Sequence, residues 1–328
     1  MVMRARGGRL AGGMTLLLAA TARAADAPTP VFVDPYDHPD APPPPTLPEL
    51  THKDVEVTGE STFGVLHPNA TPNGQRSDDE GAYVQRFSLE WPIALRRFFV
   101  GATYELAAAE PPGGGPLKFI SGNLQLTART VWATSTGLAF GGGLGVTLPT
   151  LINPSSDAAG ASSAAATLRP WDQALFLPGY ITLNPFVDVR DVDGPLVLQL
   201  REGLDLQFDT HAWSGYRTAA ITAAYIGYRI LRWLGVGIEA FEIYFFSTSV
   251  ADDLRAVFAV SPSVRIMTPY VQPALSFVTN VGTPLLGSVD TWWAVRLAAT
   301  FVWDPTRKVL SPGQDPRERL PVAAPVTP

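Results

Sequence analysis

Alternation of apolar and polar residues dominates positions 55–303 and predicts β-strands, because successive side chains of a strand point to opposite faces. In "TWWAVRLAATFVW", residues 291–303, one face carries Trp293, Val295, Leu297, Ala299, Phe301 and Trp303. The other face is mostly small, with Arg296 at its centre. About twelve such segments occur, at 55–66, 82–91, 97–107, 118–133, 136–149, 178–190, 195–209, 215–229, 233–247, 252–266, 269–282 and 288–303.

The connections between these segments are alternately short and long. Turns of a few residues alternate with polar links, the longest of which runs from residue 150 to 177. An antiparallel meander with all its long loops at one end produces this order, whereas Greek-key crossovers interrupt it. Most segments have the length of about ten residues that a tilted membrane strand requires. The fold class predicted is therefore all-β, a closed antiparallel up-and-down transmembrane β-barrel of about twelve strands, with ten to fourteen compatible.

Two features indicate that the apolar face meets lipid. The polar face holds mainly Gly, Ser, Thr and Gln rather than the Lys and Glu coat of a soluble exterior. Tryptophans lie at strand ends, as expected for amphipathic rings at a membrane–water interface. We expect two aromatic belts, formed by Trp91, Trp132, Trp233 and Trp303 beside short turns and by Trp213, Trp292 and Trp293 beside long loops.

Composition and the N-terminal segment indicate the cellular compartment of the protein. Hydrophobic residues make up 46% of the chain and charged residues only 16%, below the roughly 25% of a soluble domain. The net charge of −6 and the lack of a basic stripe give no support for a nucleic-acid partner. Arg4, Arg6 and Arg9 precede a short apolar run from Met14 to Ala20. Ala22-Arg23-Ala24 follows as a small-x-small cleavage pattern, which predicts a cleaved signal peptide over residues 1–24. The chain has no cysteine.

These features together resemble a Gram-negative outer-membrane β-barrel, over about residues 55–303. The last segment, ending "RLAATFVWD", is similar to the aromatic-ending strand by which such barrels are recognised for insertion, although about 25 residues follow it here. "GLAFGGGLGVTLPT" resembles barrels of the phenol-degradation meta-pathway transporter type. The resemblance implies short turns and both termini in the periplasm. It divides the chain into a signal peptide (1–24), an unpacked proline-rich periplasmic linker (25–52), an outer-membrane barrel (53–304) and a periplasmic tail (305–328).

Strand parity assigns six arginines and six acids to the barrel interior. They are Arg86, Arg129, Arg201, Arg255, Arg265, Arg296, Glu90, Glu105, Asp188, Asp205, Asp209 and Glu239. Two interpretations fit this balance. The charges form a selectivity region for a small polar or amphipathic solute, or they form a plug of paired groups that braces a narrow barrel.

The long connection 150–177 has two possible placements. Its Ala/Ser-rich middle is long for a hairpin loop, and long loops are often functional or unstructured. It either folds into the barrel mouth as a constriction that carries Arg169, Trp171 and Asp172, or it extends outside.

Two positions break the alternation. Glu202 shares the parity of Leu198 and Leu204, so a bulge at the adjacent Gly203 is predicted to turn it inward, with contact to a partner protomer as the alternative. In the ninth segment Phe241, Ile243 and Phe245 oppose the parity of Leu234, Val236 and Ile238, which predicts a register slip.

Catalytic chemistry has little support in the residues. His211, Ser214 and Asp209 could form a Ser–His–Asp set at the extracellular rim, as in a lipid hydrolase. The His and Cys supply is too poor for a metal site, and no cofactor is predicted. The sequence therefore predicts an outer-membrane channel or transporter for small solutes, surrounded by lipid. The alternatives are a plugged structural barrel, which could anchor a periplasmic protein partner through the proline-rich segment, and the rim hydrolase.

Overall fold

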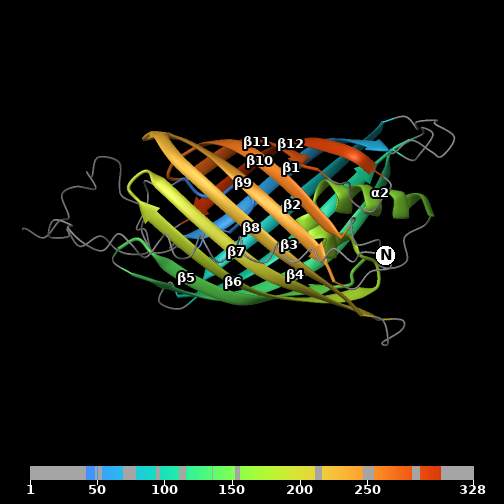
Figure 1. Ribbon diagram of the computed structural model, residues 1–328, viewed down its shortest axis with the longest axis horizontal. Coiled ribbons are helices and arrows are strands. Elements are labelled where there is room, and N and C mark those ends of the chain that lie inside the picture. Colours follow the sequence, from blue (N-terminus) through green and yellow to red (C-terminus); the bar gives the residue numbers. More distant parts are fainter. Residues whose placement is uncertain are drawn as a thin grey trace, which may run out of the picture.

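The computed structural model describes residues 42–48, 50, 54–68, 79–93, 97–110, 116–134, 136–151, 156–210, 216–246, 255–282 and 289–303. Within these residues, twelve strands form a closed antiparallel sheet in which each strand pairs with its sequence neighbours and β1 pairs with β12 (Figure 1). The strands are β1 (Val55–Pro68), β2 (Glu80–Pro92), β3 (Phe98–Ala109), β4 (Lys118–Ala133), β5 (Ala139–Leu148), β6 (Tyr180–Asp193), β7 (Leu196–Asp209), β8 (Tyr216–Leu231), β9 (Leu234–Phe245), β10 (Ala256–Ile266), β11 (Val271–Asn280) and β12 (Val289–Trp303). The predicted up-and-down barrel is confirmed, and the predicted ranges differ only by a few residues at their ends.

Closure of the sheet removes both of its edges. β12 continues in register with β1 from Val55↔Trp303 to His67↔Thr291, so the first and last strands satisfy each other's backbone groups. A sheet without edges leaves no row of unpaired N–H and C=O groups, which is what a hydrocarbon environment requires. The connections between β2 and β3, β4 and β5, β6 and β7, β8 and β9, and β10 and β11 are short, and we call their end of the barrel the short-turn end. The opposite end is the long-loop end.

The two faces of β12 show how the alternation is used. On the outer face Leu297 and Phe301 are 51% and 52% exposed, whereas Arg296 on the inner face is 1% exposed. Trp293 points outward, but Trp292 is fully buried inside the barrel. The prediction that Trp292 belongs to an aromatic belt is wrong, because adjacent residues of a strand face opposite sides.

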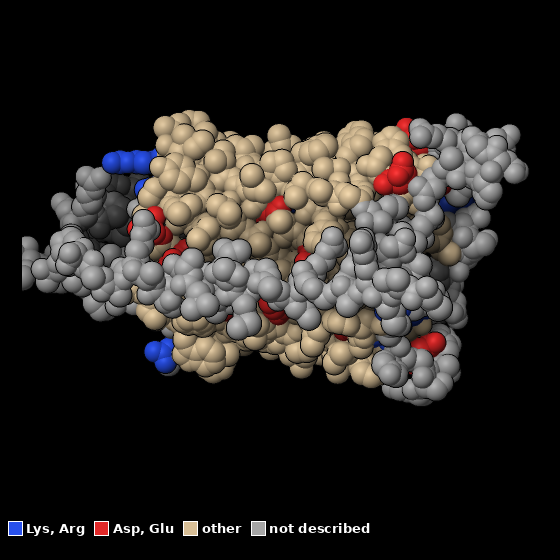
Figure 2. Space-filling view, viewed as in Figure 1, with Lys and Arg blue, Asp and Glu red and all other residues tan. Residues whose placement is uncertain are grey.

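An apolar band surrounds the barrel. Figure 2 shows it as a largely tan surface, with the visible Lys and Arg atoms near the ends and a few acidic atoms within it. Exposed tryptophans lie at the short-turn end, namely Trp91, Trp132, Trp233 and Trp303. Trp213 lies outside the described residues.

The long connection between β5 and β6 contains two helices. Helix α2 (Ser156–Leu168) lies at the long-loop end (Figure 1), and the 3-10 helix η1 (Pro170–Phe176) follows it. The sequence predicted only a long loop here, although alanine has the strongest intrinsic preference for helix. None of the helices among the described residues is long and apolar enough to cross a bilayer.

Both predicted irregularities are wrong. β7 pairs with β8 without a register shift, so no bulge turns Glu202 inward; it stays on the outer face and accepts a hydrogen bond from Thr222 Oγ1 at 2.8 Å. β9 pairs with β8 in one register from Phe245 to Gly235. Phe241 and Ile243 therefore face the interior, where they are almost fully buried. The inner face of β9 is apolar at this level because the lumen is filled there, as described below.

The orientation of the faces predicts how the barrel responds to charge. Leu297→Arg places a guanidinium in the middle of the outer face, and an arginine near the centre of a bilayer costs about 2–4 kcal/mol. We expect this variant to lower the free energy of unfolding by that amount in denaturant titrations of the protein in liposomes. Leu297→Phe, which keeps the outer face apolar, serves as the control and should unfold like the native protein. A Leu297→Arg barrel as stable as the native one would contradict the assignment of the lipid face.

Candidate functional site: the barrel lumen

Two segments enter the barrel and fill part of its lumen. The loop insert consists of α2 and η1, residues 156–176, and packs on the inner faces of β1 to β4, β9 and β12. The N-terminal insert consists of residues 42–48 and 50 and is bound by side chains of β4, β7 to β10 and β12. The sequence predicted an unpacked proline-rich linker here, and these residues differ from that prediction because their backbone is hydrogen-bonded to the barrel wall. Residues 1–41 and 304–328, including the predicted signal peptide and tail, lie outside the described residues.

A β-bulge anchors the loop insert. The register of β3 with β4 shifts between Tyr104 and Leu106, so that Gly122 and Asn123 together face Glu105. Asn123 Nδ2 donates to the carbonyl oxygens of Ala174 and Leu177 at 3.0 and 2.8 Å. Bulges re-aim side chains in this way at functional sites of barrels. The Asn123 amide thus binds the C-terminal end of the loop insert to β4.

Small residues allow α2 to lie close to the wall. Its inward-packed positions are Ala161, Ala164, Ala165 and Leu168, all of which are buried. On β1, a Cβ atom at Gly64 would lie 2.5 Å from the Leu168 side chain. The Ala/Ser-rich composition of the loop is therefore explained by the narrow space that it enters.

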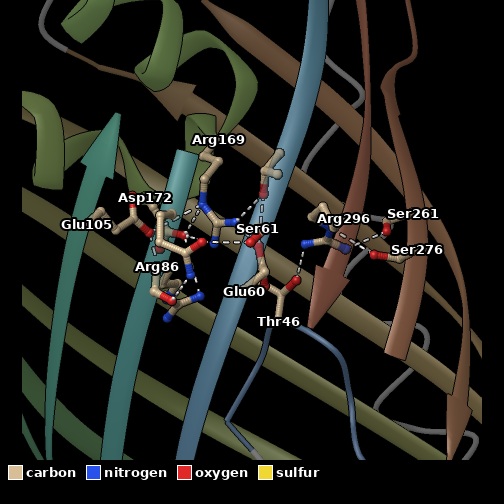
Figure 3. A network of polar contacts seen from close by, with 12 residues as sticks. Thr46, Glu60, Ser61, Arg86, Glu105, Arg169, Asp172, Ser261, Ser276 and Arg296 are labelled. Carbon is tan, nitrogen blue, oxygen red and sulfur yellow. Dashed lines mark hydrogen bonds and ion pairs between the residues drawn. The ribbon is translucent and has the colours of Figure 1, made fainter. Parts of the chain in front are cut away.

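Arg169, between the two helices, organises a buried ion cluster. We define the Arg169 cluster as Arg169, Glu60, Arg86, Glu105 and Asp172 (Figure 3). The Arg169 guanidinium pairs with Glu60 on β1, lies 3.3 Å from Glu105 Oε1 on β3, and donates to Asp172 Oδ2 at 2.7 and 3.1 Å. Arg86 on β2 lies within 3.6–3.7 Å of Asp172 and Glu105. One arginine thus ties the loop insert to two strands of the wall.

Arg169 keeps its positive charge although it is buried, because carboxylates surround it. Arg169 belongs to the connection between β5 and β6 and is fully buried. Burial alone would lower the pKa of its guanidinium, but the carboxylates of Glu60, Glu105 and Asp172 outweigh burial and raise this pKa above its ordinary value. The guanidinium therefore stays protonated at any physiological pH.

Trp171 connects the loop insert to β9. Its ring stacks on Phe241 of β9 at 4.1 Å with an interplanar angle of 16° and lies 6.5 Å from the ring of Trp292. The guanidinium carbons of Arg169 and Arg296 are each 5.7 Å from the Trp171 ring centre. Such cation–π geometry contributes more when the groups are desolvated, as they are here.

A second cluster holds the N-terminal insert. We define the Arg296 cluster as Arg296, Glu239, Thr46, Ser261 and Ser276. Glu239 Oε1 accepts the backbone N–H groups of Thr46 and Leu47 at 2.9 and 3.1 Å, and its Oε2 accepts from Arg296 at 3.2 Å. Figure 3 shows Arg296 between Thr46 on one side and Ser261 and Ser276 on the other.

Other wall residues bind the carbonyl oxygens of the same insert. Proline has no N–H and leaves its carbonyl as the hydrogen-bonding group of the backbone. These carbonyls accept from Tyr225, Arg265 and Gln199, at Pro42, Pro44 and Pro48 respectively, over 2.9–3.2 Å. Arg129, which also pairs with Glu90, donates to the Leu50 carbonyl at 2.8 Å.

The predicted interior charges occupy inward-facing positions. Ten of them lie inside the barrel, namely Arg86, Glu90, Glu105, Arg129, Asp188, Arg201, Asp205, Glu239, Arg265 and Arg296. Asp209 is the last residue of β7 and Arg255 directly precedes β10, both at the long-loop end. Arg201 and Asp188 pair through two bonds of 2.7 and 2.8 Å. Of the predicted loop residues, Arg169 and Trp171 are buried and Asp172 is largely buried within the lumen.

Sequence reasoning missed Glu60 and Arg190. Both are buried on inner faces, and Glu60 is a direct partner of Arg169. The parity rule that selected the other charges would have found them, since Glu60 alternates with Val57 and Phe63 on β1. Ser214 and His211 of the possible hydrolase set lie outside the described residues.

A cavity lies between the two inserts. It has about 160 Å³ of space open to water-sized molecules, enough for several waters. Trp171 and Asp172 line it from the loop insert and Pro43 to Pro48 line it from the N-terminal insert. The wall contributes charged side chains and a group of neutral hydroxyls and amides, among them Thr58, Ser88, Thr103, Gln125, Thr127, Asn184 and Thr300. The described residues hold no group of three or more acids or histidines placed to bind a metal ion.

Comparison with known proteins gives structural relatives only. No protein-family model and no curated protein matches the chain. The COG4313 outer membrane channel from Pseudomonas putida F1 superposes with a TM-score of 0.57 and 13% identity, covering 76% of this chain and 96% of that one. The NanC porin superposes with a TM-score of 0.48 and 10% identity, covering 75% of this chain and 98% of that one. At these identities the comparison concerns the fold, and the chain has the architecture of an outer-membrane β-barrel protein.

Proposed function

We propose that the protein spans the outer membrane and forms a narrow channel for small solutes. The observation that carries the proposal is the cavity between the two inserts, where charged and hydroxyl side chains line the space together with apolar ones such as Leu175, Ile221 and Phe241. In a barrel whose interior is closed by its own side chains, these side chains would fill the lumen throughout.

Two constrictions set the width of this channel. At the long-loop end, Arg169, Trp171 and Asp172 hold the loop insert against β1, β3 and β9. In the other half of the lumen, the N-terminal insert is held by the Arg296 cluster and by Arg129. A solute that crosses the barrel therefore has to pass both inserts.

The interior charges favour weak rather than strong ion selectivity. Arg129 pairs with Glu90, Arg201 with Asp188, and Arg296 with Glu239. Paired opposite charges leave little net field in a pore, whereas a ring of one sign would select ions by charge. We therefore expect the channel to admit solutes on the basis of size and hydrogen bonding.

A structural barrel is the second candidate. The same ion pairs and the hydrogen-bonded N-terminal insert favour it, because they brace the wall across the lumen. The two candidates differ in one property: a permanently plugged barrel passes no stepwise ionic current.

Arg169 provides the first test. Arg169→Gln removes the cation that Glu60, Glu105 and Asp172 share, and breaking a buried ion pair by removing one partner costs about 3–5 kcal/mol. We expect the loop insert to detach from the wall and the single-channel conductance in planar bilayers to rise several-fold. Arg232→Gln, at an exposed turn between β8 and β9, is the control and should conduct like the native protein. Absence of stepwise current in both the native and Arg169→Gln proteins would favour the structural barrel.

The N-terminal insert can be tested by cross-linking, since the chain contains no cysteine. A Cβ atom at Gly235 would lie 2.5 Å from Pro42 Cβ, close enough for a disulfide after an outward shift of about 1 Å. The double variant Pro42→Cys, Gly235→Cys should oxidise in the folded barrel, and reduction should increase the conductance because the insert is released. Pro42→Cys with Ile238→Cys, whose second position faces outward, should not cross-link. Failure of the first pair to oxidise would contradict placement of this insert in the lumen.

A further inference from the structure

The strand registers align neutral polar side chains into one continuous row along the lumen wall. Each member is directly opposite the next on the neighbouring strand. We call this row the polar track. It consists of Gln272, Thr300, Thr58, Ser88, Thr103, Gln125, Thr147, Thr182 and Gln207, which belong to β11, β12 and β1 to β7 in turn.

The polar track climbs from one end of the barrel to the other. Gln272 is the second residue of β11, beside the short turn that follows β10. Gln207 lies near the end of β7, beside a long connection. Barrel strands are tilted by about 35–45°, so a row perpendicular to the strands rises along the barrel axis as it passes from strand to strand.

The middle of the track forms one wall of the cavity. Thr300, Thr58, Ser88, Thr103 and Gln125 are all among its lining residues. The inward positions next to the track on β3 and β5 are Gly101 and Gly145, and Thr127 lies between them on β4. A Cβ atom at Gly101 would lie 2.5 Å from Thr127 Oγ1, so the glycine allows the Thr127 hydroxyl group to lie beside the track.

The hydrogen-bonding capacity of the track is only partly used. Thr58 Oγ1 and Thr300 Oγ1 lie 2.9 Å apart, and Gln125 Nε2 donates to Thr147 Oγ1 at 3.3 Å. Thr182 Oγ1 is fully buried and has no hydrogen-bond partner among the described residues. A hydroxyl group offers one donor and two acceptor positions. The track therefore carries both kinds of group. Five members present them to the cavity, while Thr147, Thr182 and Gln207 are buried.

We propose that the polar track is the path of neutral polyhydroxylated solutes, such as small sugars, through the barrel. This inference rests on the proposed channel function. A sugar both donates and accepts through each hydroxyl, so it can exchange one hydrogen bond for the next as it moves along successive Thr, Ser and Gln side chains. An apolar solute would leave these groups without partners, which is unfavourable in a confined site.

The flux of glucose relative to triethylene glycol, a solute of similar size with fewer hydroxyl groups, tests the track. Both fluxes are measured in proteoliposomes that contain the full chain, or its Arg169→Gln variant if the native pore is too narrow. Thr58→Val and Thr103→Val keep the shape of the wall but remove one hydroxyl each. Each lost hydrogen bond corresponds to about a 2- to 10-fold change in an equilibrium, so the ratio of the two fluxes should fall by that factor in each variant.

Thr130→Val is the matched control, because Thr130 lies on β4 with its side chain on the outer face. Its flux ratio should equal that of the protein without the substitution. If ionic current is present but neither Thr58→Val nor Thr103→Val changes the ratio, the track is not the solute path and the channel function stands. If neither the native protein nor Arg169→Gln passes ionic current, the channel function and the track are both overturned.

Discussion

The closed hydrogen-bonded sheet is the constraint on which the rest of this structure depends. Once β12 pairs with β1, every strand has two partners and the direction of each side chain is determined by its parity. Residues of one parity form the apolar band, and residues of the other parity are confined to a lumen too narrow for bulk water to screen their charges. The composition of the interior follows from this confinement, because a charge removed from water requires a partner.

The two inserts supply many of those partners. Glu60 and Glu105 on the wall meet Arg169 of the loop insert, and Arg265 and Arg129 meet carbonyl oxygens of the N-terminal insert. The loop insert and the wall therefore share charged partners, although pairs such as Arg129 with Glu90 lie within the wall. The loss of one shared partner, such as Arg169, would therefore weaken several contacts together.

The apparent irregularities of the sequence have a common origin in the filled lumen. Phe241 and Ile243 look like a register slip because an inward face is expected to be polar, yet they face the aromatic side chain of Trp171 and the buried core around it. Trp292 looks like a belt residue for the same reason. Glu202 is different, since it does remain on the outer face, where Thr222 donates to it. The alternation itself is unbroken in β7 and β9. What fails is the assumption that every inward-facing side chain is polar and every outward-facing one is apolar.

The sequence by itself determined the all-β barrel, the approximate strand ranges and the inward direction of most interior charges, because period-two alternation and turn spacing are local properties. It could not decide whether residues 150–177 enter the mouth, nor that proline-rich residues near 42–50 lie in the lumen. Those placements depend on contacts between residues far apart in the chain, such as Arg169 with Glu60 and Thr46 with Glu239. The polar track also required tertiary structure, because its members are ordinary Thr, Ser and Gln residues until the strand registers bring them side by side.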